Sequence, residues 1–128
     1  MTKRRLISTG SPMEKLAGYS RAVVQGDFVH VSGTTGFDYG TMTMPEEVVA
    51  QTRNALETIK KALGEADSCL KDIVRGRYYL ASADDVDAVF GILGEYFGDI
   101  RPAATMVICG LVSPEMRVEI EVTAQKQT

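Results

Sequence analysis

RPAATMVICGLVSPEMRVEIEVTA, residues 101–124, is the stretch that decides the fold, because it holds two strands with different surroundings. Side chains alternate between the two faces of a strand. In Met116–Ala124 one face is apolar and suits a helix layer, and the other face carries Glu119 and Glu121. In Ala103–Leu111 both faces are mostly apolar, so we expect both of them to be covered.

The first of two predicted helices follows the segment Thr43–Glu46. Threonine can cap a helix, proline suits the first turn, and a glutamate three residues after the threonine completes a capping box. We expect this helix to end near Gly64–Asp67. Its apolar stripe recurs at the helical period (Val48, Val49, Thr52, Leu56, Ile59 and Leu63).

The second predicted helix starts at Ser82–Asp85 and stops at Gly98 and Pro102. Its stripe has the same period (Val86, Val89, Phe90, Leu93 and Phe97). Phe90 and Phe97 are therefore expected in the core.

Four segments before residue 101 predict strands (Lys3–Ser8, Tyr19–Gln25, Phe28–Thr34 and Asp72–Leu80). The second and third are separated only by the turn dipeptide Gly26-Asp27, which indicates a hairpin. Thr35–Met44 should be a loop. The element order is then β-ββ-α-β-α-ββ, which predicts a single α+β domain over residues 1–128, with one mixed β-sheet and two helices on one face.

The second face of this sheet needs a cover. In Asp72–Leu80, alternation places Val74, Gly76, Tyr78 and Leu80 on the helix side, and Ile73, Arg75, Arg77 and Tyr79 on the open side. No third helix is predicted, so the simplest cover is another copy of the chain. The alternative is a solvated face that tolerates a few apolar residues.

Charge and composition exclude several classes of function. The net charge of −3 and the pI of about 5.1 argue against a nucleic-acid binder, which needs a dense basic surface. No segment has the apolar length that spans a bilayer, and no apolar run follows the N-terminal charges. We therefore expect a cytoplasmic protein without membrane association, in which Cys69 and Cys109 are reduced thiols.

Motifs for metals, nucleotides and flavins do not occur in the sequence. His30 is the only histidine and no Cys-x-x-Cys exists, so no metal site is expected. The glycines of SGTTGFDYG, residues 32–40, match neither the P-loop nor the dinucleotide pattern. No cofactor is predicted.

Six segments resemble the RidA/YjgF family, also called the L-PSP endoribonuclease family (GYSRAV at 18–23, FVHVSG at 28–33, TRNALETIKKALGEAD at 52–67, DIVRGRYYL at 72–80, RPAATMV at 101–107 and VEIEVTA at 118–124). The resemblance implies a chorismate-mutase-like fold assembled as a homotrimer. Three subunits would pack their sheets into a central barrel, with a ligand cleft at each subunit boundary.

The resemblance also implies a chemistry. Members of the deaminase branch hydrolyse reactive enamines and imines, such as 2-aminoacrylate, that leak from pyridoxal-phosphate enzymes. By this resemblance the water-handling carboxylate falls on Glu119. The substrate-binding positions fall on Tyr19, Ser20, Gly33 and Thr105.

One departure from the family pattern concerns the group that holds the substrate carboxylate. The arginine of the deaminase branch falls on Ala104, which has no hydrogen-bond donor in its side chain. Arg77 and Arg75 share the predicted open face with Glu119, so either guanidinium is a candidate replacement. The alternative is that both arginines pair with Glu119 and Glu121, across the sheet or across the interface between copies. Arg101 is expected at a strand entrance.

Two smaller departures lie near the first hairpin. Arg21 and Thr34 stand where the family has glutamines. Three interpretations of function remain open. The first is hydrolysis of an enamine or imine metabolite other than simple 2-aminoacrylate, and the second is a non-catalytic small-ligand-binding or interaction trimer. The third, endoribonuclease activity, is disfavoured by the acidic charge balance.

Overall fold

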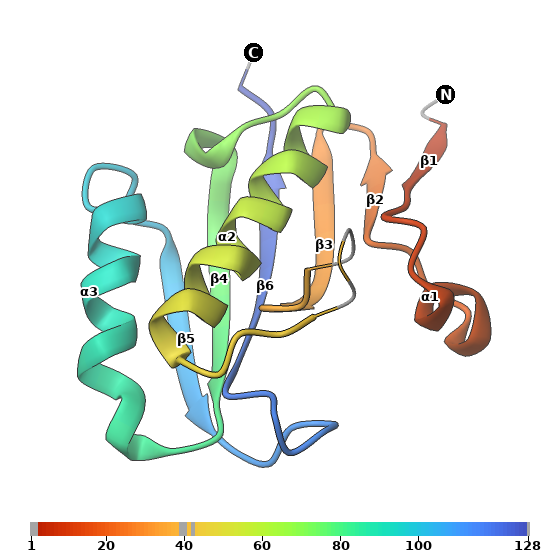
Figure 1. Ribbon diagram of the computed structural model, residues 1–128. Helices are drawn as coiled ribbons and strands as arrows, with labels where there is room; N and C mark the ends of the chain where they lie inside the picture. The colour runs from red at the N-terminus through yellow and green to blue at the C-terminus, as the bar shows by residue number, and fades with distance from the viewer. Residues whose placement is uncertain (1–2, 39–40, 42, 128) are drawn as a thin grey trace.

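The computed structural model describes residues 3–38, 41 and 43–127, and these form a six-stranded sheet with three α-helices (Figure 1). In chain order the elements are β1 (Arg4–Ile7), α1 (Pro12–Ala17), β2 (Ala22–Gln25), β3 (Phe28–Thr35), α2 (Val48–Glu65), β4 (Ile73–Leu80), α3 (Val86–Phe97), β5 (Ala103–Ile108) and β6 (Val118–Gln125). Short 3-10 turns precede β4 (Leu70–Asp72) and α3 (Ala83–Asp85).

The sheet has the strand order β1-β2-β3-β6-β4-β5, so the last strand of the chain lies inside it. β6 is antiparallel to both β3 and β4, and only the β4–β5 pair is parallel. α3 connects these two parallel strands. The α+β class, the mixed sheet and the predicted order of strands and long helices are confirmed.

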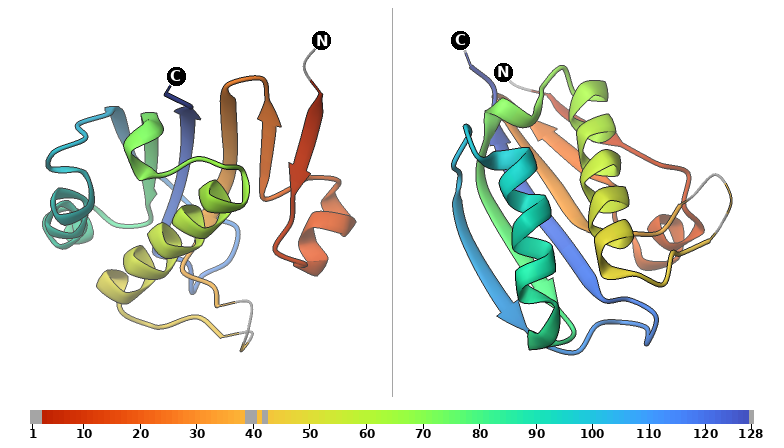
Figure 2. Two further views of the ribbon diagram at one scale, coloured as in Figure 1. Left: turned by 90° about the horizontal axis from the view of Figure 1, so that it is seen from above. Right: turned by 60° about the vertical axis from the view of Figure 1, so that its left-hand side comes forward.

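α2 and α3 lie side by side over one face of the sheet (Figure 2). Their apolar stripes meet the apolar face of β6, and the core lies between the two layers. Thr52, Leu56, Ile59 and Leu63 of α2 are fully buried, as the helical period predicts. On β6, Val118, Ile120, Val122 and Ala124 are buried as well.

The predicted hairpin is present, but its first strand is shorter than expected. Gln25 pairs with Phe28 across the Gly26-Asp27 turn, whereas β2 begins at Ala22 and not at Tyr19. Beyond Ala22, the Ser32 amide donates to the Arg21 carbonyl at 2.9 Å and the Ser32 hydroxyl donates to the Ser20 carbonyl at 2.6 Å.

The predicted capping box at Thr43–Glu46 is wrong. The backbone of Thr43 pairs with that of Asp38 in an isolated β-bridge, which holds Thr43 away from the helix. α2 begins only at Val48, after an extended Glu47 whose side chain makes no capping hydrogen bond. The remaining loop prediction, Thr35–Met44, falls partly outside the described residues.

Three further details differ from the sequence prediction. Val74 is 42% exposed and Ile73 is buried, the reverse of the expected faces, because the β4–β6 register shifts between Ile73 and Arg75. Phe90 is 55% exposed and therefore is not a core residue, whereas Phe97 is buried.

The short helix α1 was not predicted. Ser11 caps it, Pro12 occupies its first turn, and Gly18 ends it in the left-handed conformation with φ of 74°. α1 lies at the β1 end of the sheet (Figure 1). None of the helices in the described residues combines the length and apolar character needed to cross a bilayer.

Candidate functional site

Glu119 lies on the open face, which we define as the face of the sheet opposite α2 and α3. Its register partners are Thr35 on β3 and Tyr79 on β4. The carboxyl is half-buried, and this burial raises the pKa of Glu119. The neighbouring charge of Glu121 raises the pKa further, and the charge of Arg21 opposes the shift.

Gly33 provides the space in which the Glu119 carboxylate lies. The β3–β6 register is irregular between Val31 and Thr34, so the backbone at Gly33 departs from the regular ladder. A Cβ on Gly33 would overlap Glu119 Oε2. The structure thus brings together Gly33 and Glu119, two of the residues that the sequence singled out. It also explains why position 33 has no side chain.

Arg21 connects this pair to the first hairpin strand. Its side chain is 1% exposed, and Nη1 donates to the Gly33 carbonyl at 2.7 Å and to Thr34 Oγ1 at 3.0 Å. The Tyr19 ring lies over the guanidinium, with Cζ 5.7 Å from the ring centroid. Sequence reasoning recorded Arg21 only as a departure from the family pattern and missed these contacts.

A second row of polar side chains crosses the open face beside Glu119. Arg77 on β4 lies between Glu121 on β6 and Thr105 on β5 in the strand register. The Tyr79 hydroxyl donates to Glu121 Oε1, and this hydrogen bond raises the pKa of Tyr79. Sequence analysis assigned no role to the Tyr79–Glu121 contact.

Arg75 occupies the corresponding place one row further, between Thr123 and Ala103. In the part of the chain that the structure describes, neither Arg75 nor Arg77 forms an ion pair within 4.0 Å. The alternative that both arginines pair with acidic side chains of their own sheet is therefore not what the single chain shows.

Thr105 and Glu119 are not brought together within one chain. Thr105 is exposed on the edge strand β5, and β4 separates β5 from β6. Two strand spacings amount to roughly 10 Å. A ligand that touches both residues would have to bridge β4 or contact them from two copies of the chain.

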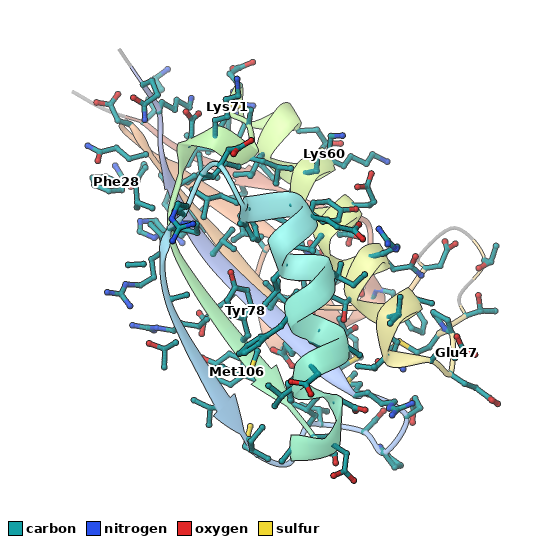
Figure 3. All side chains as sticks on the ribbon, turned by 90° about the vertical axis from the view of Figure 1, so that its left-hand side faces the viewer. Phe28, Glu47, Lys60, Lys71, Tyr78 and Met106 are labelled. Carbon is teal, nitrogen blue, oxygen red and sulfur yellow. The ribbon has the colours of Figure 1, made fainter. Side chains whose placement is uncertain are left out.

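Ala104 lines a pocket of about 580 Å³ between α3 and β5. Tyr78 and Met106 lie in this gap between the sheet and the helix (Figure 3). Phe90 and Phe97 form its helix side, so the pocket is largely apolar where the family resemblance would place an arginine. The guanidinium-bearing residue at this pocket is Arg101, which has φ of 57°.

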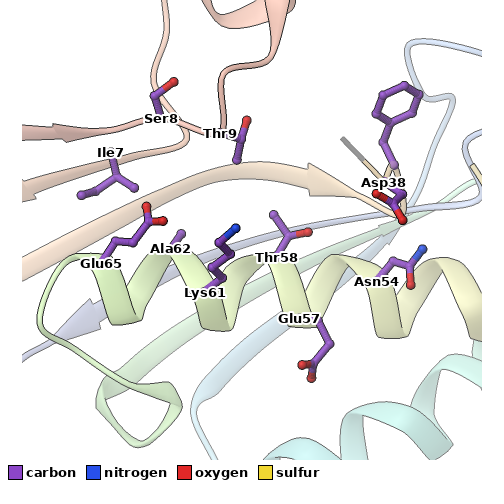
Figure 4. A pocket seen from close by; sticks show the side chains of 11 residues that line it. Ile7, Ser8, Thr9, Asp38, Asn54, Glu57, Thr58, Lys61, Ala62 and Glu65 are labelled. Atoms are coloured by element: carbon purple, nitrogen blue, oxygen red, sulfur yellow. The ribbon is translucent and has the colours of Figure 1, made fainter. Parts of the chain in front are cut away.

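A second pocket of about 510 Å³ lies between α2 and the segment that follows β1. Thr58 and Lys61 of α2 point toward that segment, Asn54 points toward Asp38, and Glu57 points away from the pocket (Figure 4). Glu57 instead accepts a hydrogen bond from Tyr96 of α3 at 2.6 Å. None of the residues predicted for the site lines this pocket.

The chemistry available on the open face is acid–base chemistry. Glu119 is a carboxylate with a raised pKa, which brings it nearer to the range where it can both accept and return a proton. Within the described residues, no three His, Cys, Asp or Glu side chains gather closely enough to hold a metal ion.

Comparison with known proteins agrees with this fold. The endoribonuclease L-PSP family matches residues 9–126. The 3-aminoacrylate deaminase RutC of Acinetobacter baylyi is 36% identical over 121 residues, which cover 94% of this chain and 95% of RutC. The uncharacterized protein SCO2049 of Streptomyces coelicolor is 35% identical and is covered to 92%, with 95% of this chain aligned.

Solved structures support the same family. The crystal structure of Rv2704 from Mycobacterium tuberculosis, a YjgF-family protein, superimposes with a TM-score of 0.88 at 40% identity, covering 96% of this chain and 99% of Rv2704. Sequence match and backbone agreement both extend over nearly the whole chain. The protein therefore belongs to the endoribonuclease L-PSP family, the family also known as RidA/YjgF.

Proposed function

We propose that this protein hydrolyses reactive imine or enamine metabolites, with Glu119 as the group that handles water. The observation that carries the proposal is the half-buried Glu119 carboxylate, held against Gly33 with a raised pKa. Its similarity to a protein named as a 3-aminoacrylate deaminase supports the same class of reaction.

The proposed reaction needs one proton-transfer group and a water molecule. Glu119 accepts a proton from water as the water oxygen bonds to the imine carbon, and it passes this proton to the nitrogen, which takes up the C=N electron pair. The resulting carbinolamine then loses ammonia. As the C–N bond breaks, Glu119 accepts the hydroxyl proton and passes it to the departing nitrogen, so that ammonia, a carbonyl product and the free carboxylate remain.

We propose that the preferred substrate is not simple 2-aminoacrylate. Ala104 offers no donor for a small carboxylate. The apolar pocket that Ala104 lines is on the helix side of the sheet, so it does not hold a substrate that Glu119 reaches from the open face. An anionic group on the substrate would be held by Arg77 on the open face, with Thr105 beside it and Arg75 one row away.

We propose that the site is completed by a second copy of the chain in a homotrimer. Val107 and Ile108 on the edge strand β5 are 42% and 47% exposed in the single chain. An apolar edge of this kind is a surface that natural proteins cover. Contact between copies would also let Thr105 of one chain approach Tyr19, Ser20 and Glu119 of another.

The oligomer is tested by sedimentation at micromolar concentration. We expect the wild-type protein to sediment as a trimer and a Val107→Glu variant to dissociate, because the charge would be buried in the contact. A Leu16→Glu variant serves as the control and should remain trimeric, because Leu16 is an exposed residue of α1, at the opposite end of the sheet from β5. A folded wild-type monomer would refute the shared cleft.

The reaction is tested by ammonia release from enzymatically generated imines. The panel includes 2-aminoacrylate, 3-aminoacrylate and the imines of leucine and phenylalanine. We expect an imine other than 2-aminoacrylate to react fastest, and we expect Glu119→Gln to lower the rate by about 10²-fold or more. Glu121→Gln removes the same charge from the neighbouring position and should have a much smaller effect. Rates no faster than buffer across the panel would contradict the proposal.

The anion-binding role of Arg77 is tested with the same panel. Arg77→Gln should raise KM for substrates that carry a carboxylate and leave kcat almost unchanged, because the lost contact is present before and during the reaction. Arg75→Gln is the matched control from the same strand. Equal effects of the two variants would argue against a specific contact.

A non-catalytic ligand-binding trimer is the second candidate, and the alanine at position 104 is the observation that favours it. In that case calorimetry would detect binding of apolar 2-oxo acids while ammonia release stays at the buffer rate. The two free thiols, Cys69 and Cys109, suit a reducing compartment, and we propose the cytosol.

A further inference from the structure

Arg21 is a buried cation with no established task. It precedes β2 and is among the largest fully buried side chains in the described residues. Removing a guanidinium from water is expensive unless its donors and its charge are matched. The contacts of Arg21 therefore indicate what the charge is for.

Three residues of the candidate site meet at this guanidinium. Nη1 donates to the Gly33 carbonyl at 2.7 Å, and the Tyr19 ring lies over Cζ at 5.7 Å. Glu119 lies against Gly33 from the other side, where a Cβ would overlap its Oε2. Arg21 is thus the one side chain that contacts or faces Tyr19, Gly33 and Glu119 together.

Arg21 and Thr34 form a matched pair. Nη1 also donates to Thr34 Oγ1 at 3.0 Å, and the Thr34 hydroxyl donates in turn to the Ser32 carbonyl at 2.8 Å. These hydrogen bonds hold the guanidinium, and therefore its positive charge, in a fixed place beside Gly33.

The charges around Glu119 show where this positive charge acts. Glu121 faces Glu119 from the same strand, Tyr79 faces it from β4, and Arg21 faces it from behind Gly33. Burial and Glu121 raise the pKa of Glu119, and Arg21 lowers it. Arg21 is the only cation that influences this carboxyl among the described residues.

The same guanidinium faces a second carboxylate on α1. Glu14 accepts hydrogen bonds from the Thr9 hydroxyl at 2.6 Å and the Thr9 amide at 3.1 Å. Burial raises the pKa of Glu14, but the hydrogen bonds and the charge of Arg21 outweigh it, so the pKa lies below its usual value. Arg21 therefore lies between an acid of the scaffold and an acid of the site.

We propose that Arg21 is the positioning residue of this site, a buried cation that fixes the Gly33 carbonyl and the Tyr19 ring and balances the charge of Glu119 without touching the substrate. The inference rests on the proposed role of Glu119. It also separates Arg21 from the missing clamp at position 104, because a guanidinium that is 1% exposed and bound to Gly33 and Thr34 cannot present a bidentate face to a ligand.

The test follows the Glu119 carboxyl by carbon NMR as pH is varied, assigned with Glu119→Gln. In Arg21→Gln we expect the pKa of Glu119 to rise by roughly one pH unit, the lower end of what loss of a nearby opposite charge produces. Thr34→Val is the control, because it removes a contact at the same place and keeps the charge. Its Glu119 carboxyl should titrate as in the wild type.

Arg21→Lys keeps the test decisive if Arg21→Gln does not fold. It retains the charge and loses the planar fork, so the Glu119 titration should stay close to wild type while the Gly33 amide resonance moves. An unchanged Glu119 pKa in folded Arg21→Gln, or a rise of roughly one pH unit in Arg21→Lys, which keeps the charge, would overturn the proposal. The NMR readout does not need turnover, so failure of the ammonia assay and failure of this inference are separate results.

Discussion

The carboxylate of Glu119 fills the space that a side chain on Gly33 would require. Glu119 is on β6, and Gly33 lies in the irregular part of β3. Their contact fixes where a proton can be taken up on the open face. A substitution at Gly33 therefore tests this contact without disturbing the rest of the fold.

Gly33→Ala should displace the Glu119 carboxylate without unfolding the protein. The overlapping atom is the end of a flexible side chain, which can rotate at a cost of about 1 kcal/mol. We expect near-normal urea unfolding together with a changed Glu119 pKa in an NMR titration. A Glu119 titration identical to wild type would mean that the two residues are not in contact.

Gly36→Ala should be destabilising, in contrast to Gly33→Ala. A Cβ on Gly36 would lie 2.6 Å from Gln51 Cβ and 2.8 Å from the Gln51 carbonyl oxygen, so α2 itself would have to move. Overpacking of this kind costs about 1–3 kcal/mol in the free energy of unfolding. Gly64→Ala is the matched control: nothing lies within 4 Å, and alanine should stabilise α2 by up to about 1 kcal/mol. Urea titrations at one protein concentration would compare them.

Gln51→Leu should lower the free energy of unfolding by at least about 2 kcal/mol. Gln51 is fully buried, and its amide donates to the carbonyls of Pro45 and Glu115 at 2.8 and 2.9 Å. Its oxygen accepts from the Arg117 amide at 2.9 Å. Leucine would leave three backbone groups without partners.

Asn54→Ala provides the comparison, because Asn54 satisfies a single carbonyl, that of Gly36, at 3.1 Å. It should cost clearly less than Gln51→Leu in the same urea titration. Equal losses would show that the three buried contacts of Gln51 contribute no more than one partly exposed contact.

Glu119 should make stability fall as pH rises. The folded state holds the Glu119 proton more tightly than the unfolded chain because burial raises the pKa. Between the unfolded and folded pKa values the folded state binds more protons, so the free energy of unfolding decreases as pH increases through this window. Above the folded pKa the loss is complete and constant.

Glu119→Gln should therefore be more stable than wild type at pH 7, and the difference should shrink as the pH falls below the carboxyl's folded pKa. Thermal unfolding of both proteins across pH 4–8 would measure this difference. A variant that is less stable than wild type at every pH would show that Glu119 raises the free energy of unfolding, contrary to this prediction.

Periodicity predicted the long helices because a stripe of buried residues repeats over many turns, as from Thr52 to Leu63 in α2. It could not predict α1, whose six residues are too few to establish a period. The signs of α1 were local, in the Ser11-Pro12 start and the Gly18 stop. Alternation likewise failed at Ile73, because a register shift reverses the faces without leaving a mark in the residue types.

The candidate site was also predictable only in part. Alternation along β6 places Glu119 on the open face. Its role and that of Gly33 came only from the family resemblance. The central contact of Arg21 is its hydrogen bond to the Gly33 carbonyl, in the part of β3 where the register is irregular. No pattern in the neighbouring residues predicts that geometry.

The position of β6 has a consequence for how the molecule is made. A ribosome emits β1, β2 and β3 first and β4 and β5 later, yet no hydrogen-bonded ladder joins these groups until β6 enters between β3 and β4. The emerging polypeptide must therefore keep two partial sheets apart, each with an unsatisfied edge, until its final strand is available. β6, the strand that carries Glu119, is thus also the strand that joins the two halves of the sheet.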